Sequence, residues 1–304
     1  MSRRLPGGAL RGDNPVALRH GDRVRRFLVH VPPGGAGPLP VVLNFHGGGS
    51  NAAQQRSYSG MDATADRHGF VVAYPEGTGI RLGQRHLLTF NAGRCCPPAS
   101  RNNVDDVGFA EAIVGWLRRH LEIDGRRIYA TGMSNGGMMA HRLAAESGVF
   151  AAVASVAGQL NVASFAPVRP VSVLEFHSVD DARARYGGGA GSRFPGTRPR
   201  NVFPPVQAGI DQWAAHNGCP PEPAVGPVRT GEPGTVDEGQ TVTVLRYGPG
   251  RAGTEVVLYR FTGAGHVWPG SGVALPRILG RPTTLLDANE VMWRFFAAHQ
   301  APES

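Results

Sequence analysis

The segment at residues 128–144, IYATGMSNGGMMAHRLA, limits the fold of this chain more narrowly than any other. It begins as a short β-type run, passes through a glycine-rich turn that contains Ser134, and continues as a Met/Ala/Leu segment with helical spacing. Bulky side chains beside the serine would collide with the adjoining strand and helix, whereas Gly132 and Gly136 remove those collisions. The segment therefore predicts a strand, a tight turn and a helix, with Ser134 at the turn.

Residues 132–136 fit the pattern G-x-S-x-G of a nucleophile elbow, in which the serine hydroxyl projects above the edge of the sheet. The helix that follows points its free N–H groups toward the site, where they can stabilise negative charge. A chain with 43 glycines can contain this pentapeptide by chance, so the strand before it and the helix after it carry the argument. We expect Ser134 to be a nucleophile.

The rest of the chain alternates strand-like and helix-like segments. Residues 22–31 alternate polar and apolar side chains, and the later apolar runs suit strands that are covered on both faces of a sheet. Strands that alternate with helices predict an α/β fold with a mostly parallel sheet. The expected strands are 22–31, 40–45, 70–75, 128–130, 149–156, 171–176 and 255–261, and the expected helices are 58–68, 107–121 and 287–299.

The 304 residues suffice for one large core. We expect a poorly ordered N-terminal extension at 1–20 and a single catalytic domain at 21–300. Two irregular insertions, at 77–104 and 186–206, interrupt the rhythm of strands and helices. The first contains the Cys95-Cys96 pair, and the second is rich in Gly, Pro and Arg and should lie on the surface. The strand–helix pattern resumes after each, so neither resembles an interdomain linker.

A serine nucleophile needs a base and an acid, which hydrolases with this type of elbow supply in the order Ser, Asp or Glu, His. Asp180 and Asp181 follow one strand, and His266 follows another. Position along the chain does not separate the two aspartates. His177 is a rival base, but it precedes the acid, and we expect it to pack at the end of its strand.

The oxyanion that forms during acyl transfer needs at least two preorganised donors. The backbone N–H of Asn135, directly after the serine, is one expected donor. The second should come from His46-Gly47-Gly48-Gly49, where small residues let the backbone approach a substrate. We expect Gly48 to be this donor, with Gly49 as its neighbour in the substrate site.

Composition excludes several other classes of protein. The net charge is +8 and all 31 basic residues are arginine, but they are scattered along the chain, so we expect no nucleic-acid partner. No apolar run approaches the ~20 residues that span a bilayer, so we expect no membrane partner. The three cysteines lack metal-site spacing. A bridge from Cys219 to Cys95 or Cys96, or a fully reduced set, both remain open.

The N-terminal residues 1–15 carry charge but no apolar core of a signal peptide. As written, the sequence predicts a cytoplasmic protein, or a secreted one if a leader has been removed. The sequence predicts no particular oligomeric state.

Six motifs together resemble one family, the polyhydroxybutyrate depolymerase/feruloyl esterase group of α/β-hydrolase esterases, which is related to carbohydrate esterase family 1. The resemblance runs from about residue 20 to 298. It rests on LNFHGGG, VDDVGF, YATGMSNGGMM, EFHSVDDARARYGGG, WAAHNGC and GHVWPG, in this order.

The resemblance implies an α/β-hydrolase fold, a Ser-Asp-His triad and no cofactor. Alignment with the family motif selects Asp181 as the acid, with Ser134 as nucleophile and His266 as base. It also suggests Tyr186 and Trp268 as substrate-binding residues. Trp268 could form an aromatic wall of the pocket or, equally, pack under its loop.

The implied substrate is a small or oligomeric ester. We expect hydroxyalkanoate oligomers or short-chain esters, with feruloyl or acetyl esters of plant polysaccharide as the alternative. Ser178 replaces a family glycine and Ala184-Arg185 replace Val-Pro beside the acyl pocket, so these differences bear on the choice of substrate and not on the chemistry. A non-catalytic binding protein of the same fold would be expected to lack members of the triad.

Overall fold

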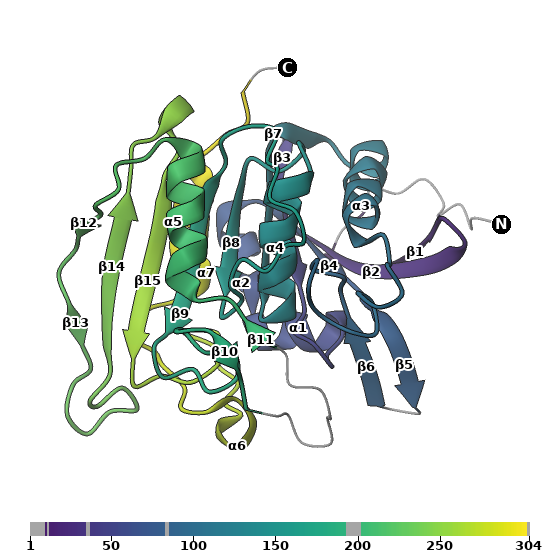
Figure 1. The fold of residues 1–304 in the computed structure, drawn as a ribbon. Helices are drawn as coiled ribbons and strands as arrows, with labels where there is room; N and C mark the ends of the chain where they lie inside the picture. Colours follow the sequence, from purple (N-terminus) through teal and green to yellow (C-terminus); the bar gives the residue numbers. More distant parts are fainter. Residues whose placement is uncertain (1–9, 11, 35–36, 83–84, 193–201, 303–304) are drawn as a thin grey trace.

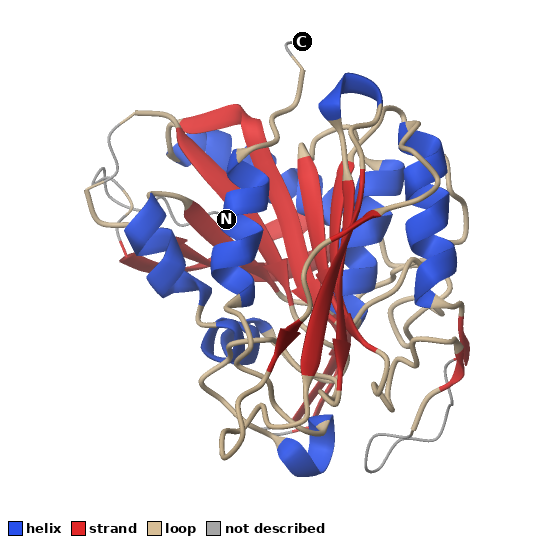
Figure 2. Cartoon of the chain, turned by 90° about the vertical axis from the view of Figure 1, so that its left-hand side faces the viewer, coloured by secondary structure: helices blue, strands red, loops and turns tan. Residues whose placement is uncertain are grey.

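The computed structural model describes residues 10, 12–34, 37–82, 85–192 and 202–302 of the chain. A central sheet of eleven strands runs through the molecule, with helices on both of its faces (Figures 1 and 2). Its strands are β1 (Gly12–His20), β2 (Arg23–Val31), β3 (Leu39–Phe45), β4 (Val71–Pro75), β7 (Ile123–Met133), β8 (Ala152–Val156), β9 (Ser172–Ser178), β12 (Ala224–Val225), β13 (Arg229–Thr230), β14 (Thr241–Tyr247) and β15 (Val256–Thr262).

The strand order is β1-β2-β4-β3-β7-β8-β9-β15-β14-β12, and β13 also pairs with β14. The six strands from β4 to β15 in this order are parallel to one another, and the outer strands pair antiparallel. Their carboxyl ends therefore meet at one edge of the sheet, which is the lower edge in Figure 1. In folds of this kind, ligands bind at that edge.

Three helices, α3 (Asp106–His120), α4 (Asn135–Glu146) and α5 (Val206–Asn217), cover one face of the sheet. The opposite face is covered by α1 (Ala52–Ser59), α2 (Met61–His68) and α7 (Ala288–Ala297). Each face has its own apolar core, one around Phe109, Met138 and Trp213, the other around Met61, Met292 and Phe296. The sheet is thus buried on both sides, which explains the unbroken apolar runs of its central strands.

Smaller elements lie mainly near the carboxyl edge of the sheet (Figure 1). They are the hairpin β5 (Thr78–Leu82) and β6 (Arg85–Thr89), the pair β10 (Gly189–Ala190) and β11 (Val202–Phe203), and the helix α6 (Pro276–Leu279); the 3-10 turn η1 (Arg251–Gly253) precedes β15. No described helix has both the length and the apolar character needed to cross a membrane.

Several expected boundaries differ from the observed ones. The expected helix at 58–68 is two helices, because Gly60 adopts a left-handed conformation with φ 61° and ends α1. Residues 12–20, expected to be a poorly ordered extension, form the edge strand β1. Pro15 weakens the sequence signal of this strand, but a proline is tolerated at a sheet edge.

The two expected insertions are also more structured than predicted. Residues 77–104 contain the β5–β6 hairpin, and the flanks of 186–206 contribute β10 and β11. Residues 193–201 of the second insertion, and residues 1–9 and 11 of the expected extension, lie outside the described part of the chain.

A buried ion pair connects β2 to the start of α3. Arg25 donates to Oδ1 of Asp106 over 2.6 Å, and both side chains are at most 3% exposed. The second carboxylate oxygen accepts the Asn91 N–H at 2.7 Å, and the guanidinium lies 3.9 Å from the ring centre of Phe109. Asp106 therefore ties the irregular segment after β6 to the sheet.

We expect Asp106→Ala to lower the free energy of unfolding by about 3–5 kcal/mol, because the substitution leaves the buried Arg25 charge unpaired. Urea unfolding of the wild type and the variant measures the change. As a control, Glu146→Ala removes a partly exposed partner of Arg142 and should cost less than about 1 kcal/mol. Equal losses of stability in the two variants would contradict the role of Asp106 as the partner of a buried charge.

Candidate active site

Ser134 lies between the end of β7 and the start of α4, at the carboxyl edge of the sheet. Its backbone has φ 55° and ψ −116°, a conformation that a non-glycine residue rarely adopts. Its N–H donates to the Val156 carbonyl at 2.7 Å, and its carbonyl accepts from Met138 N–H at 2.9 Å. The turn is therefore held by the neighbouring strand and by the first turn of the helix. The side chain of Ser134 is partly exposed.

The glycines around Ser134 are required by close packing of backbone on backbone. A Cβ at Gly136 would overlap the carbonyl oxygen of Phe45 on β3. At Gly132, a Cβ would lie 2.5 Å from the carbonyl carbon of Gly136 and 2.6 Å from the Phe45 oxygen. The structure confirms the strand, tight turn and helix expected from the sequence, and it identifies β3 as the neighbour that excludes side chains.

Asp181 and His266 meet at the ends of the adjacent parallel strands β9 and β15. Oδ2 of Asp181 lies 2.6 Å from Nδ1 of His266, and the two residues are 3% and 1% exposed. The other carboxylate oxygen accepts the N–H groups of Arg183 and Ala184 at 2.7 and 2.9 Å. Burial acts to raise the pKa of Asp181, but His266 and then His177 outweigh it and hold that pKa below its ordinary value.

Asp180, the other aspartate that the sequence leaves open, is exposed and has a different contact. Its Oδ2 accepts the N–H of Gly263 at 2.6 Å, which ties the turn after β9 to the end of β15. Asp181 is therefore the aspartate that contacts the imidazole of His266. His177 is buried, with Nδ1 2.9 Å from Glu175 and Nε2 2.6 Å from the Ala184 carbonyl, so both of its ring nitrogens are engaged.

The His46–Gly49 loop lies directly beside the turn at Ser134. The Cβ position of Gly47 is 3.7 Å from Cβ of Ser134, and that of Gly48 is 3.7 Å from Cβ of Asn135. The N–H of Gly49 donates to the Leu88 carbonyl at 2.8 Å, which engages that amide in holding the β5–β6 hairpin. Gly48 and Asn135, the two expected oxyanion donors, are thus neighbours in the fold.

His46 anchors this loop from inside the protein. Its Nε2 accepts the N–H of Gly77 at 3.0 Å, so the ring proton is on Nδ1, which donates to the Gly47 carbonyl at 2.8 Å. Ser50 N–H also donates to that carbonyl, at 3.1 Å. Complete burial lowers the pKa of His46 to about 4. A trans peptide directs its N–H opposite to its carbonyl, so these contacts also orient the Gly48 N–H.

Asn135 connects the turn at Ser134 to the segment after β6. Its Oδ1 accepts from Phe90 N–H at 2.7 Å and its Nδ2 donates to the Phe90 carbonyl at 2.9 Å. The sequence analysis identified the backbone of Asn135 but missed this side-chain role. The signal was available in the polar residue directly after the serine, but its partner lies 45 residues away.

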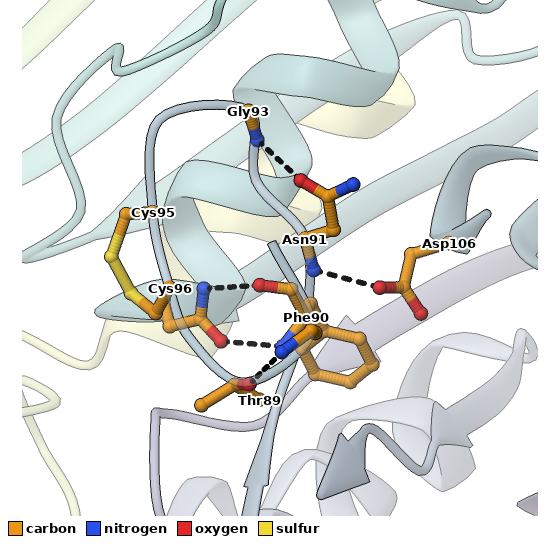
Figure 3. The surroundings of a disulfide bond; sticks show 9 residues. Thr89, Phe90, Asn91, Gly93, Cys95, Cys96 and Asp106 are labelled. Atoms are coloured by element: carbon orange, nitrogen blue, oxygen red, sulfur yellow. Dashed lines mark hydrogen bonds between the residues drawn. A yellow bond between two sulfur atoms is a disulfide. The ribbon is translucent and has the colours of Figure 1, made fainter. Parts of the chain in front are cut away.

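A disulfide joins Cys95 to Cys96 in the same segment (Figure 3). The N–H of Cys96 donates to the Phe90 carbonyl at 3.2 Å, so the disulfide contacts the residue that Asn135 holds. Cys219 is free. Both alternatives that the sequence left open, a bridge to Cys219 and a fully reduced set, are therefore wrong, because Cys95 and Cys96 bond to each other.

The two expected substrate-binding aromatic residues have different surroundings. Trp268 is 1% exposed and its Nε1 donates to Asn289 at 3.1 Å, which favours the packing interpretation over the aromatic wall. Tyr186 is partly exposed, and its hydroxyl donates to Gln207 on α5 at 3.1 Å. Ser271 and Tyr58 pack beside Trp268 and hold its loop on α1.

Among the described residues, Asp13, His30 and Asp62 form one group with metal-ligand spacing. Arg56 pairs with both carboxylates of this group, and Nδ1 of His30 donates to Asp13 over 2.9 Å. The positive charge of Arg56 already occupies the place that a cation would take, so this group is an ion-pair network.

The mostly parallel sheet, the serine at a strand-to-helix turn and the Asp–His pair at the same edge define an α/β-hydrolase. Over residues 26–196 the chain matches the family described as Esterase PHB depolymerase, and it belongs to that family. Family membership makes it a carboxylic ester hydrolase.

Known proteins of this kind are similar to the chain at modest identity. NocK of Nocardia uniformis subsp. tsuyamanensis, whose name describes it as a candidate esterase, is 30% identical over 82% of this chain and 72% of its own length. Feruloyl esterase B of Piromyces equi is 29% identical over 80% of this chain, which spans only 42% of that protein. Poly(3-hydroxyalkanoate) depolymerase C of Paucimonas lemoignei is 26% identical over 86% of this chain and 62% of that protein.

Solved structures share the fold at lower identity. Native pOPH superposes with a TM-score of 0.52 at 18% identity, covering 86% of this chain and 83% of that chain. An acetyl xylan esterase from Aspergillus awamori superposes with a TM-score of 0.50 at 15% identity, covering 80% and 89%. These similarities establish the α/β-hydrolase architecture.

We expect the free energy of unfolding to fall as the pH drops from 6.5 to about 4, because the unfolded chain takes up a proton at His46 that the folded chain excludes. His46→Gln removes this contribution, worth on the order of 3 kcal/mol over that interval. Urea unfolding across the interval measures it, with His120→Gln, on the exposed end of α3, as control. A difference between wild type and His46→Gln that stays constant with pH would contradict a buried neutral His46.

Proposed function

We propose that Ser134, Asp181 and His266 form a catalytic triad that hydrolyses esters through an acyl-enzyme. The observation that carries this proposal is the buried Asp181–His266 hydrogen bond at 2.6 Å, at the same sheet edge as the strained Ser134 turn. We also propose that residues 21–300 act as a single catalytic domain.

In the proposed mechanism, His266 removes the proton of the Ser134 hydroxyl as its oxygen attacks the ester carbonyl. Asp181 holds the imidazole through Nδ1 and stabilises its charged form. The imidazolium then donates its proton to the departing alcohol, which leaves an acyl group on Ser134. Water, activated by the same histidine, releases the acid and restores the serine.

The N–H groups of Gly48 and Asn135 donate hydrogen bonds to the carbonyl oxygen as negative charge develops on it. Each donor contributes on the order of 3 kcal/mol to transition-state stabilisation. Two neighbouring contacts support this role: His46 orients the peptide that contains the Gly48 N–H, and the Asn135 side chain is fixed on Phe90.

We propose hydroxyalkanoate oligomers and short-chain aliphatic esters as the substrate class. Exposed apolar side chains near the proposed triad suit such acyl groups. Leu87 on β6 is 46% exposed and lies next to Gly49. Ile278 on α6 is 42% exposed, and its carbonyl accepts a hydrogen bond from Arg183 in the turn after β9. Feruloyl or acetyl esters of polysaccharide are the alternative, favoured by similarity to the Piromyces equi enzyme.

Ser134→Ala should abolish hydrolysis of p-nitrophenyl acetate and butyrate, because the variant lacks the oxygen that attacks the carbonyl. Release of p-nitrophenol measures the rate, and thermal unfolding checks that the variant is folded. Ser57→Ala, which changes an exposed serine on α1, should retain wild-type activity. Full activity of folded Ser134→Ala would sink the proposed nucleophile.

A panel of p-nitrophenyl octanoate, hydroxybutyrate trimer and methyl ferulate tests the substrate class. We expect the trimer to be hydrolysed with a higher kcat/KM than methyl ferulate. The opposite order by a wide margin would transfer the assignment to hydroxycinnamoyl esters and leave the triad unaffected.

Asp181→Asn should lower kcat/KM by on the order of 10³–10⁴-fold, since an amide can no longer fix the reactive tautomer of His266. Asp180→Asn is the matched control, because it changes the adjacent aspartate, which contacts the Gly263 backbone. We expect less than about a threefold change for this control, judged against the small effects of exposed groups. A larger loss in the control than in Asp181→Asn would reverse the assignment of the acid.

A further inference from the structure

A chain of buried polar side chains lies behind the proposed catalytic acid. It runs from Trp213 on α5 through His141 on α4 to Glu175 and His177 on β9, and Glu175 is 0% exposed. The proposed mechanism uses none of these four residues. Buried ionisable groups are costly unless they are paired, so the protonation state of each one can be argued from its partners.

The tryptophan end of the chain has a defined proton arrangement. Trp213 Nε1 can only donate, and it lies 3.1 Å from Nδ1 of His141, so that nitrogen accepts. The proton of neutral His141 is therefore on Nε2, which lies 3.0 Å from Oε2 of Glu175 and donates to it. Glu175 thus accepts at one oxygen.

The hydrogen bonds at the other end of the chain fit a charged histidine. Nε2 of His177 lies 2.6 Å from the carbonyl oxygen of Ala184, which can only accept. Nδ1 lies 2.9 Å from Oε1 of Glu175, whose other oxygen already accepts from His141. The arrangement is satisfied when Glu175 is a carboxylate and His177 carries protons on both nitrogens.

His177 also contacts the turn that contains Asp181. Its Nε2 lies 3.6 Å from Oδ2 of Asp181, the same oxygen that lies 2.6 Å from His266. The Ala184 residue whose carbonyl accepts from His177 donates its own N–H to Asp181 Oδ1 at 2.9 Å. One imidazole thus holds the turn in place and adds a charge next to the proposed acid.

We propose that His177, kept as an imidazolium by Glu175, is a positioning residue that fixes Asp181 and opposes protonation of the Asp181–His266 pair. The role rests on the proposed function of that pair. Its consequence is that the enzyme stays active to lower pH than an Asp–His pair without this neighbouring charge.

Two other titratable or charged side chains lie next to His177 and contribute to the electrostatic potential there. Tyr186 contacts it edge-on, with ring centres 6.1 Å apart, and Arg260 on β15 is its register partner. Arg260 also interacts electrostatically with the Tyr186 hydroxyl. These groups stay in place when His177 alone is changed.

The directions of the pKa shifts agree with the hydrogen bonds. Burial acts to lower the pKa of His177, but the hydrogen bond and charge of Glu175 outweigh it and raise that pKa above its ordinary value. Burial acts to raise the pKa of Glu175, and the bonds from His141 and His177 hold that pKa below its ordinary value.

His177→Gln keeps a donor for Ala184 and removes the charge. We expect the acid limb of the kcat/KM profile for p-nitrophenyl butyrate to move up by about one pH unit, while the plateau stays within about threefold of wild type. A purely structural role would lower the plateau and leave the limb in place, and that result would overturn the proposal.

His30→Gln is the matched control. His30 also lies between two carboxylates, 2.9 Å from Asp13 and 2.8 Å from Asp66, but its strand β2 is separated from β9 by four strands of the sheet. His30→Gln should leave the acid limb of the kcat/KM profile where it is in the wild type. An equal shift in this control would assign the effect to total charge and overturn the proposal.

A second measurement does not depend on activity or on folding of the His177 variant. Nitrogen NMR of the full chain labelled at histidine should show both ring nitrogens of His177 protonated at about pH 8, well above the ordinary histidine pKa. Glu175→Gln, which changes only the surroundings of His141 and His177, identifies the signal. A neutral His177 would overturn the proposal even if esters are hydrolysed, whereas failure to hydrolyse any ester would sink the proposed function alone.

Discussion

The structure depends on a backbone-to-backbone contact between the first turn of α4 and the end of β3. A Cβ at Gly136 would overlap the Phe45 carbonyl, so α4 can approach β3 this closely only because the residue that faces Phe45 lacks a side chain. This contact forces Ser134 into its left-handed backbone conformation and brings Asn135 next to Gly48. The strain at one residue is supported by the two packed elements around it, as expected for a strained conformation at a functional site.

Around this turn, buried charges occur in compensated groups. Arg25 pairs with Asp106 below the segment that contacts Asn135, and Glu175 pairs with His177 behind the turn of Asp181. A buried ion pair adds little net stability, but removal of one partner is costly, so such pairs hold the segments they connect in one arrangement. The loops of the candidate site are thereby fixed to β2 and β9 by buried charged groups.

Local sequence patterns predicted the elements that carry the site. The glycines around Ser134 and the apolar run before His46 identified the β7–α4 turn and the loop after β3, because both signals are confined to a few adjacent residues. The same reasoning failed where a partner lies far along the chain. The side chain of Asn135 bonds to Phe90, 45 residues away, and the burial of Trp268, which the sequence left open, depends on α1 and α7 and not on its own loop.

The sequence by itself determined the class of fold, the tight turn at Ser134 and the two aspartates and one histidine from which an acid and a base could come. Tertiary structure supplied the contact behind the choice of Asp181, which the family motif had selected: both aspartates lie on the same turn, and the packing of β9 against β15 directs Asp181 toward His266 and Asp180 toward Gly263. It also decided the charge environment of that acid. Whether a histidine is neutral or charged depends on the acceptors around both of its nitrogens, and for His177 these come from β9 and from the turn that contains Ala184.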